Sequence, residues 1–139
     1  MRSAVTGGRA VLGALALLVA QPVAADRPPL SEVREIDGAL LAVAIANEVR
    51  QRCDDIEPRM IRALGTLNGL KAKARALGYG EDEIEDYVTS EAEKARMRRL
   101  GEVYVRQQGA DPAVTAELCA FGRAQIASST AVGRLLREK

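Results

Sequence analysis

The sequence predicts an all-α fold, a single compact bundle of four to five helices that is closed by one disulfide and preceded by a signal peptide. Three observations lead to this prediction. Apolar side chains recur at spacings of three and four along most of the chain, and runs of β-branched residues are absent. A short uncharged stretch lies near the N-terminus, and both cysteines follow it. The length of 139 residues suits one domain.

The N-terminal segment has the pattern of a secretory leader. Arg2 and Arg9 are the only charges before Asp26, residues 10–20 are uncharged and largely apolar, and small residues follow just before position 26. A positive start, a short apolar centre and a small-residue end are typical of a signal peptide. The alternative is an uncleaved membrane anchor, but a membrane span needs about 20 apolar residues. We therefore expect a leader that is removed.

Removal of this leader changes the charge of the protein. We expect residues 1–25 to be the signal peptide, with cleavage after Ala25, and residues 26–139 to be a single helical domain in the periplasm without a membrane span. Of the 20 basic and 19 acidic residues, 18 basic and 19 acidic ones remain, so the formal charge falls from +1 to −1. This balance removes the electrostatic argument for binding nucleic acid or a membrane surface.

The two cysteines, Cys53 and Cys119, predict one disulfide. An exported chain enters an oxidising compartment, where a lone pair of cysteines is normally joined. The bridge would close a loop of 66 residues and stabilise the fold by about 4 kcal/mol. The alternative is two buried, unpaired thiols. A redox enzyme is disfavoured because the chain has no Cys-x-x-Cys motif.

Two long helices are predicted in the first half of the domain. The first begins after Ser31 as its cap and ends at Asp54-Asp55. Its two adjoining apolar stripes indicate a central position in the bundle. The second contains Pro58 in its first turn and ends at Gly78. The stripe of this second helix consists of Met60, Leu64, Leu67, Leu70, Ala74 and Leu77.

Three further helices are predicted in the second half. A short one covers Glu81 to Val88, and the next runs from a capping box of Ser90 and Glu93 to about Gln107. Asp111-Pro112 is predicted to start the last long helix, with Asp111 as cap and the proline in the first turn. The apolar residues Val132, Leu135 and Leu136 are expected to form a terminal amphipathic turn.

Two charged clusters are candidate binding surfaces. Glu81, Asp82, Glu85 and Asp86 offer oxygen ligands to a cation, although a helix N-terminus alone also favours acidic residues. A basic run follows, but acidic residues three or four positions away predict a solvated, partly paired helix face. That run consists of Lys94, Arg96, Arg98, Arg99 and Arg106.

A partner protein needs an exposed apolar patch, and two segments are candidates for one. Gly65 and Gly69 lie four apart in the second helix, a spacing that permits a neighbouring helix to approach closely. Such a helix can belong to the same chain, which is the simpler interpretation, or to a partner. The second candidate is the C-terminal tail around Leu135 and Leu136.

Several short stretches of the chain share the pattern of one protein family. They are Pro29-Leu30-Ser31-Glu32-Val33 with Ile36-Asp37, Arg52-Cys53-Asp54, Lys73-Ala74-Arg75-Ala76-Leu77-Gly78-Tyr79, Glu93-Lys94-Ala95-Arg96-Met97-Arg98, Leu118-Cys119 with Gly122, and Gly133-Arg134-Leu135-Leu136. On these residues the chain resembles a family of small exported alphaproteobacterial proteins known only as a domain of unknown function. The likeness covers nearly all of residues 29–139. It implies a periplasmic helical domain with this cysteine pair, and it implies no activity, substrate or catalytic residue.

The absence of histidine limits the kinds of catalysis and metal binding that this chain can carry out. It excludes Ser-His-Asp and Cys-His catalysis and imidazole metal sites, so we predict no catalytic residue, no metal and no cofactor. We favour a non-enzymatic module that binds a periplasmic or envelope protein. The alternatives are a small enzyme that uses carboxylate, Tyr or Arg groups, and a binder of a small ligand or cation.

Overall fold

The computed structural model describes residues 27–139, and the predicted signal peptide lies outside the described residues. Five α-helices and a two-stranded sheet make up this part of the chain. In chain order the elements are η1 (Leu30–Glu32), α1 (Arg34–Arg52), β1 (Ile56–Pro58), α2 (Met60–Ala76), α3 (Glu81–Thr89), α4 (Glu91–Gln107), α5 (Thr115–Ala127), η2 (Gly133–Leu135) and β2 (Leu136–Glu138).

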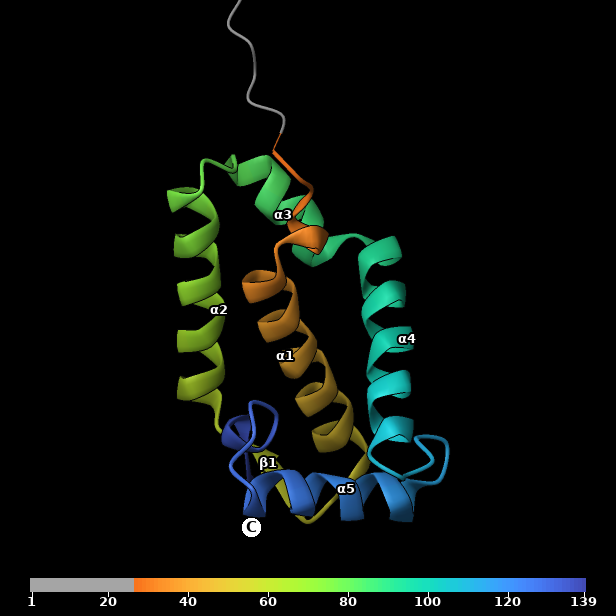
Figure 1. Cartoon of the computed structure of the whole chain (residues 1–139). Coiled ribbons are helices and arrows are strands. Elements are labelled where there is room, and N and C mark those ends of the chain that lie inside the picture. The colour runs from red at the N-terminus through yellow and green to blue at the C-terminus, as the bar shows by residue number, and fades with distance from the viewer. Residues whose placement is uncertain (1–26) are drawn as a thin grey trace, which may run out of the picture.

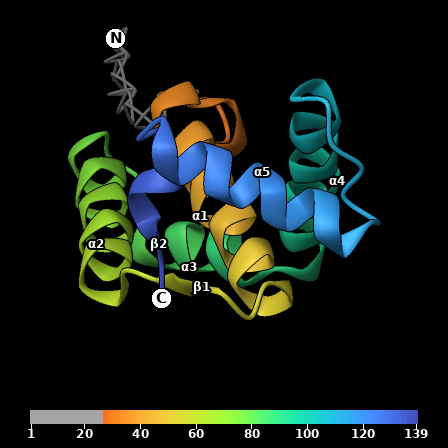
Figure 2. The same ribbon diagram turned by 90° about the horizontal axis from the view of Figure 1, so that it is seen from below.

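Helix α1 lies at the centre of the bundle, as its wide apolar face predicts. In Figure 1, α2 and α4 lie on either side of it, α3 covers one end and α5 crosses the other end. The view along the bundle in Figure 2 shows α5 lying across α1. The main core forms where α1, α5 and the C-terminal segment meet, around the fully buried Val49. A second cluster fills the space between α1 and α3 around Ile36 and Ile84.

The predicted disulfide between Cys53 and Cys119 is present, and the two Cα atoms lie 5.6 Å apart. It connects the C-terminal end of α1 to the first half of α5. Close by, α5 approaches α1 through Gly122. A Cβ on this glycine would lie 2.7 Å from Cγ1 of Val49. The bridge and this close contact therefore fix the crossing of the first and last helices.

The C-terminal segment differs from the prediction. Leu136–Glu138 forms β2 rather than a helical turn, and it pairs antiparallel with Ile56–Pro58 of β1. The expected amphipathic turn shrinks to the short η2. The apolar spacing of this segment fits a helix, but the sheet gives Leu136 a fully buried position and a backbone partner. The same pairing places Pro58 in β1, so α2 begins two residues later than expected.

Two further helix starts, those of α1 and α5, also differ from the prediction, whereas the start of α4 is confirmed. Ser31 lies in η1 and does not cap α1, which begins at Arg34. Asp111 caps a turn by accepting a hydrogen bond from the backbone N–H of Ala113, and α5 begins only at Thr115. At α4 the cap is correct, since the Ser90 hydroxyl accepts a hydrogen bond from Glu93 N at 3.1 Å. The Glu93 carboxylate does not complete the box but accepts from Arg96.

No helix within residues 27–139 is both long enough and apolar enough to cross a membrane.

Candidate functional site

A groove of about 740 Å³ runs between α1 and α4. This volume lies within the range of about 300–1,000 Å³ that ligand sites normally have. One face of α1 forms one wall, because its lining residues recur at spacings of three and four. From α1 they are Leu40, Val43, Ala44, Ile45, Asn47, Glu48, Gln51 and Arg52. Gly101 of α4 lies opposite, and a Cβ there would be 3.2 Å from Ile45, so the two helices meet closely along the groove floor.

The groove changes from apolar to polar along its length. Near α3 it is lined by half-buried apolar side chains, among them Leu40, Val43 and Val88. Near the α4–α5 loop it is lined by Glu48, Arg52 and other charged or amide groups. An occupant of this groove therefore needs an apolar part at one end and polar groups at the other.

The carboxylates of the groove each have an arginine partner. Glu48 pairs with Arg52 at 3.4 Å and Glu102 pairs with Arg106 at 3.2 Å, while Glu93 contacts Arg96 at 2.8 Å. The exposed Arg98 lines the groove and has no carboxylate partner among residues 27–139. Arg98 is therefore the cationic group that remains free to bind an acidic group of an occupant.

A polar network joins α1, α3 and α4 at the apolar end of the groove. The guanidinium of Arg96 forms an ion pair with Asp37 and also donates to Glu93. The hydroxyl of Tyr87 donates a hydrogen bond to Oδ1 of Asp37 at 2.7 Å. The side chains of Asp37 and Arg96 are only 17% and 26% exposed. One cation thus lies between two carboxylates in a largely desolvated position.

The pKa values of two members of this network, Tyr87 and Arg96, are raised. Burial, followed by the hydrogen bond to Asp37, raises the pKa of Tyr87 far above its usual value. The hydrogen bond to Asp37 likewise raises the pKa of the Arg96 guanidinium. Tyr87 therefore stays neutral at physiological pH, and its hydroxyl proton is already engaged in the hydrogen bond to Asp37. General acid–base catalysis needs a side chain that can exchange a proton with a substrate. Because these side chains are engaged with one another, the arrangement favours a structural role, in which they hold three helices together, over catalysis.

Arg52 fixes the opposite end of the groove. Its guanidinium donates to the carbonyl oxygens of Pro112 and Ala113 at 2.5 and 3.2 Å, and to Oγ1 of Thr115 at 3.0 Å. These contacts hold the α4–α5 loop against the end of α1. Both ends of the groove are thus held by hydrogen-bonded arginines, which pre-forms the site before any occupant binds.

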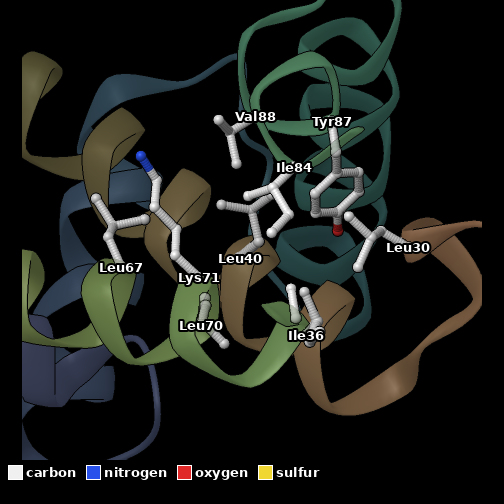
Figure 3. A pocket seen from close by; sticks show the side chains of 10 residues that line it. Leu30, Ile36, Leu40, Leu67, Leu70, Lys71, Ile84, Tyr87 and Val88 are labelled. Carbon is white, nitrogen blue, oxygen red and sulfur yellow. The ribbon is translucent and has the colours of Figure 1, made fainter. Parts of the chain in front are cut away.

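A second, much smaller cavity lies between α1, α2 and α3. Figure 3 shows its side chains, which are almost all apolar and converge from the three helices. Its volume is about 20 Å³, which is room for about one water molecule. This cavity is a packing gap rather than a ligand site.

The four acidic residues predicted as a cation site lie on the exposed first turns of α3. Glu81 turns away to Arg75, whose hydrogen bond lowers the pKa of the Glu81 carboxyl. Among residues 27–139, no three His, Cys, Asp or Glu side chains are grouped so that they could hold a metal ion. The structure therefore does not bring Glu81, Asp82, Glu85 and Asp86 together as ligands.

The two predicted partner segments have different environments. Leu135 and Leu136 are buried in the main core, so they are not accessible to a partner. Gly65 and Gly69 are exposed on α2, and a Cβ at either position would meet nothing within 4 Å. No helix of the described chain approaches them, contrary to the simpler interpretation of this spacing.

The groove was not predicted from the sequence. A signal was present, because the two adjoining apolar stripes of α1 are wider than one neighbouring helix can cover. Pairing of this helix with α4 along only part of its face leaves Val43 and Ala44 half-buried. Periodicity identifies such a face, but it does not show how much of the face remains open.

Comparisons with known proteins give one match. The model of a family described as "Family of unknown function (DUF5333)" matches residues 28–137. No curated protein matches the chain. No solved structure matches it either.

Proposed function

The chain belongs to this family of unknown function, and we propose that it is an exported, non-enzymatic module that holds a segment of another envelope protein in the groove between α1 and α4. The observation that carries the proposal is the groove itself. Its half-buried apolar wall lies beside the unpaired Arg98 in a chain whose other groove charges are balanced. Amphipathic segments bind in grooves of this kind through an apolar face and a few polar contacts.

Export is supported by two observations. The leader pattern of residues 1–25 predicts secretion and cleavage after Ala25. The disulfide between Cys53 and Cys119 suits an oxidising compartment. Cell fractionation with intact mass measurement tests this part. We expect the protein in the periplasmic fraction with the mass of residues 26–139, and a cytoplasmic protein of full mass would contradict it.

The lining of the groove specifies the chemistry of the partner. Apolar side chains of the partner would lie against Leu40, Val43 and Val88, and an acidic side chain or a C-terminal carboxylate would pair with Arg98. The enzyme alternative has no comparable support, because the carboxylates of the groove are each held by an arginine.

Neighbouring arginines of α4 provide a matched test. Arg98 lines the groove, whereas Arg99 is also exposed and does not line it. The wild-type protein and the variants Arg98→Glu and Arg99→Glu are purified from native periplasm, and co-purifying proteins are quantified by mass spectrometry. We expect a partner that is retained by Arg99→Glu and lost about tenfold or more with Arg98→Glu. Equal retention by both variants, or no partner of the wild-type protein, would refute the proposal.

A further inference from the structure

The near-neutral charge of the domain conceals a separation of charge. The acidic residues of α3 lie at one end of the bundle, which is the upper end in Figure 1. At the lower end, the start of α2 lies beside the C-terminal segment. Five exposed basic residues belong to this lower end, namely Arg59, Arg62, Arg134, Arg137 and Lys139.

Hydrogen bonds hold the side chains of three of these basic residues, Arg59, Arg62 and Arg137. Arg59 donates to the carbonyl oxygen of Leu136 at 3.0 Å, and Arg62 donates to that of Arg134 at 3.2 Å. Arg137 is paired with Glu57 across the sheet. No carboxylate within residues 27–139 pairs with Arg59, Arg62 or Arg134. The start of α2 and the C-terminal segment therefore carry three exposed arginines without a carboxylate partner in the described part of the chain, and two of them contact that segment.

Exposed apolar side chains adjoin Arg59 and Arg62 in the sequence. Met60, Ile61 and Leu64 of the first turns of α2 are 55%, 91% and 54% exposed. Ile61 is the most exposed of the large apolar side chains in the described part of the chain. The first two members of the predicted α2 stripe, Met60 and Leu64, are therefore only partly covered by the rest of the bundle.

We propose that this end of the molecule binds the surface of an anionic phospholipid bilayer. The contact surface, called the basic apolar end below, consists of Arg59, Met60, Ile61, Arg62, Leu64 and Arg134. Exposed apolar side chains beside unpaired arginines suit the headgroup boundary, where the apolar side chains enter the acyl region and the guanidinium groups meet phosphates. The inference is independent of the proposed function, because it uses a different surface.

The distribution of charge also gives the molecule an orientation. The acidic end of α3 points away from a negatively charged surface when the basic apolar end faces it. Two carboxylates at this end, Asp55 and Glu57, are paired with Arg123 and Arg137. The exposed Asp54 and Glu138 remain as opposing charges at this end. The three unpaired arginines still leave a local positive excess.

Vesicle binding tests the proposal. The protein is purified from the periplasmic fraction, and its partition is measured on vesicles of pure phosphatidylcholine and on vesicles with about one third phosphatidylglycerol. We expect binding only to the anionic vesicles, with loss of binding at high salt. Ile61→Ser should lower the partition coefficient about tenfold. Arg62→Gln should lower it about fivefold.

Two matched variants serve as controls. Leu77→Ser removes an apolar side chain that is 48% exposed at the opposite end of α2, and Arg99→Gln removes an exposed charge on α4. Both should bind anionic vesicles as the wild-type protein does, and circular dichroism should show all four variants folded. Equal losses for Ile61→Ser and Leu77→Ser would overturn the proposal. Absence of wild-type binding would also overturn it, and an acidic protein would then be the better occupant.

Discussion

Replacing both Cys53 and Cys119 by alanine tests how the disulfide stabilises this domain. The bridge spans 66 residues of sequence. For a loop of that size, the chain-entropy model gives a stabilisation of about 4 kcal/mol at 25 °C. The total free energy of unfolding of a small domain is roughly 5–15 kcal/mol, so the bridge contributes a large part of it. We expect a variant that still folds but unfolds much more easily.

The expected change in melting temperature follows from the entropy of unfolding. That entropy is about 0.24 kcal/mol/K for a domain of this length, so a loss of about 4 kcal/mol lowers Tm by about 17 °C. Thermal unfolding followed by circular dichroism measures this change. The wild-type protein in reductant serves as the control, since it loses the covalent bond and keeps both sulfur atoms.

The two measurements together can refute the reasoning. Equal and large decreases in the double variant and in the reduced wild-type protein support stabilisation by loop closure. A decrease below about 5 °C in fully reduced wild-type protein would refute it. A large decrease in the variant alone would instead assign the effect to lost packing, because both cysteines are buried.

Three further predictions concern packing and the polar network. Gly122→Ala places a methyl group 2.7 Å from an α1 side chain and should destabilise the domain by about 2 kcal/mol, whereas Gly65→Ala, with nothing within 4 Å, should stabilise it by about 0.5–1 kcal/mol; urea unfolding compares the two. Arg96→Met leaves the carboxylates around it without a cation and should cost about 2 kcal/mol at pH 7, less than a fully buried pair. Urea unfolding at pH 7 measures this cost, and an unchanged free energy of unfolding would contradict this account. The pKa of Tyr87 is raised in the folded state, so its contribution is complete below about pH 10 and is lost as the unfolded chain deprotonates first at higher pH. In a urea series from pH 8 to pH 11, Tyr87→Phe should therefore lose stability less steeply than the wild-type protein, and parallel curves would disprove the assignment.

Much of the helical fold could be predicted because its signals are local. The spacing of apolar residues identified α1 and α4, and the cap at Ser90 placed the start of α4 correctly. The pairing of the only two cysteines needed no geometry. The helix predictions depend on residues within a few turns of one another. The disulfide prediction depends on there being only one possible pair of cysteines.

The remaining features depend on contacts between distant residues. The strand at Leu136–Glu138 forms only because Ile56–Pro58 provides a backbone partner, and its apolar spacing alone suggested a helix. The exposure of Met60 and Leu64 depends on which elements pack against the start of α2, and the spacing of its apolar residues does not show this. The groove and the separation of charge are likewise properties of the assembled bundle. Neither can be predicted from the net charge or from the spacing of apolar residues in one helix.

The pairing of β1 with β2 also makes the sheet a contact between distant parts of the chain. Glu57 pairs with Arg137, which lies 80 positions further along the sequence. The main core needs the same C-terminal segment, because Val132, Leu135 and Leu136 belong to it. Bringing two segments so far apart together costs loop-closure entropy before the contact stabilises anything. The sheet and this side of the core are therefore expected to form late in folding, after the local helices.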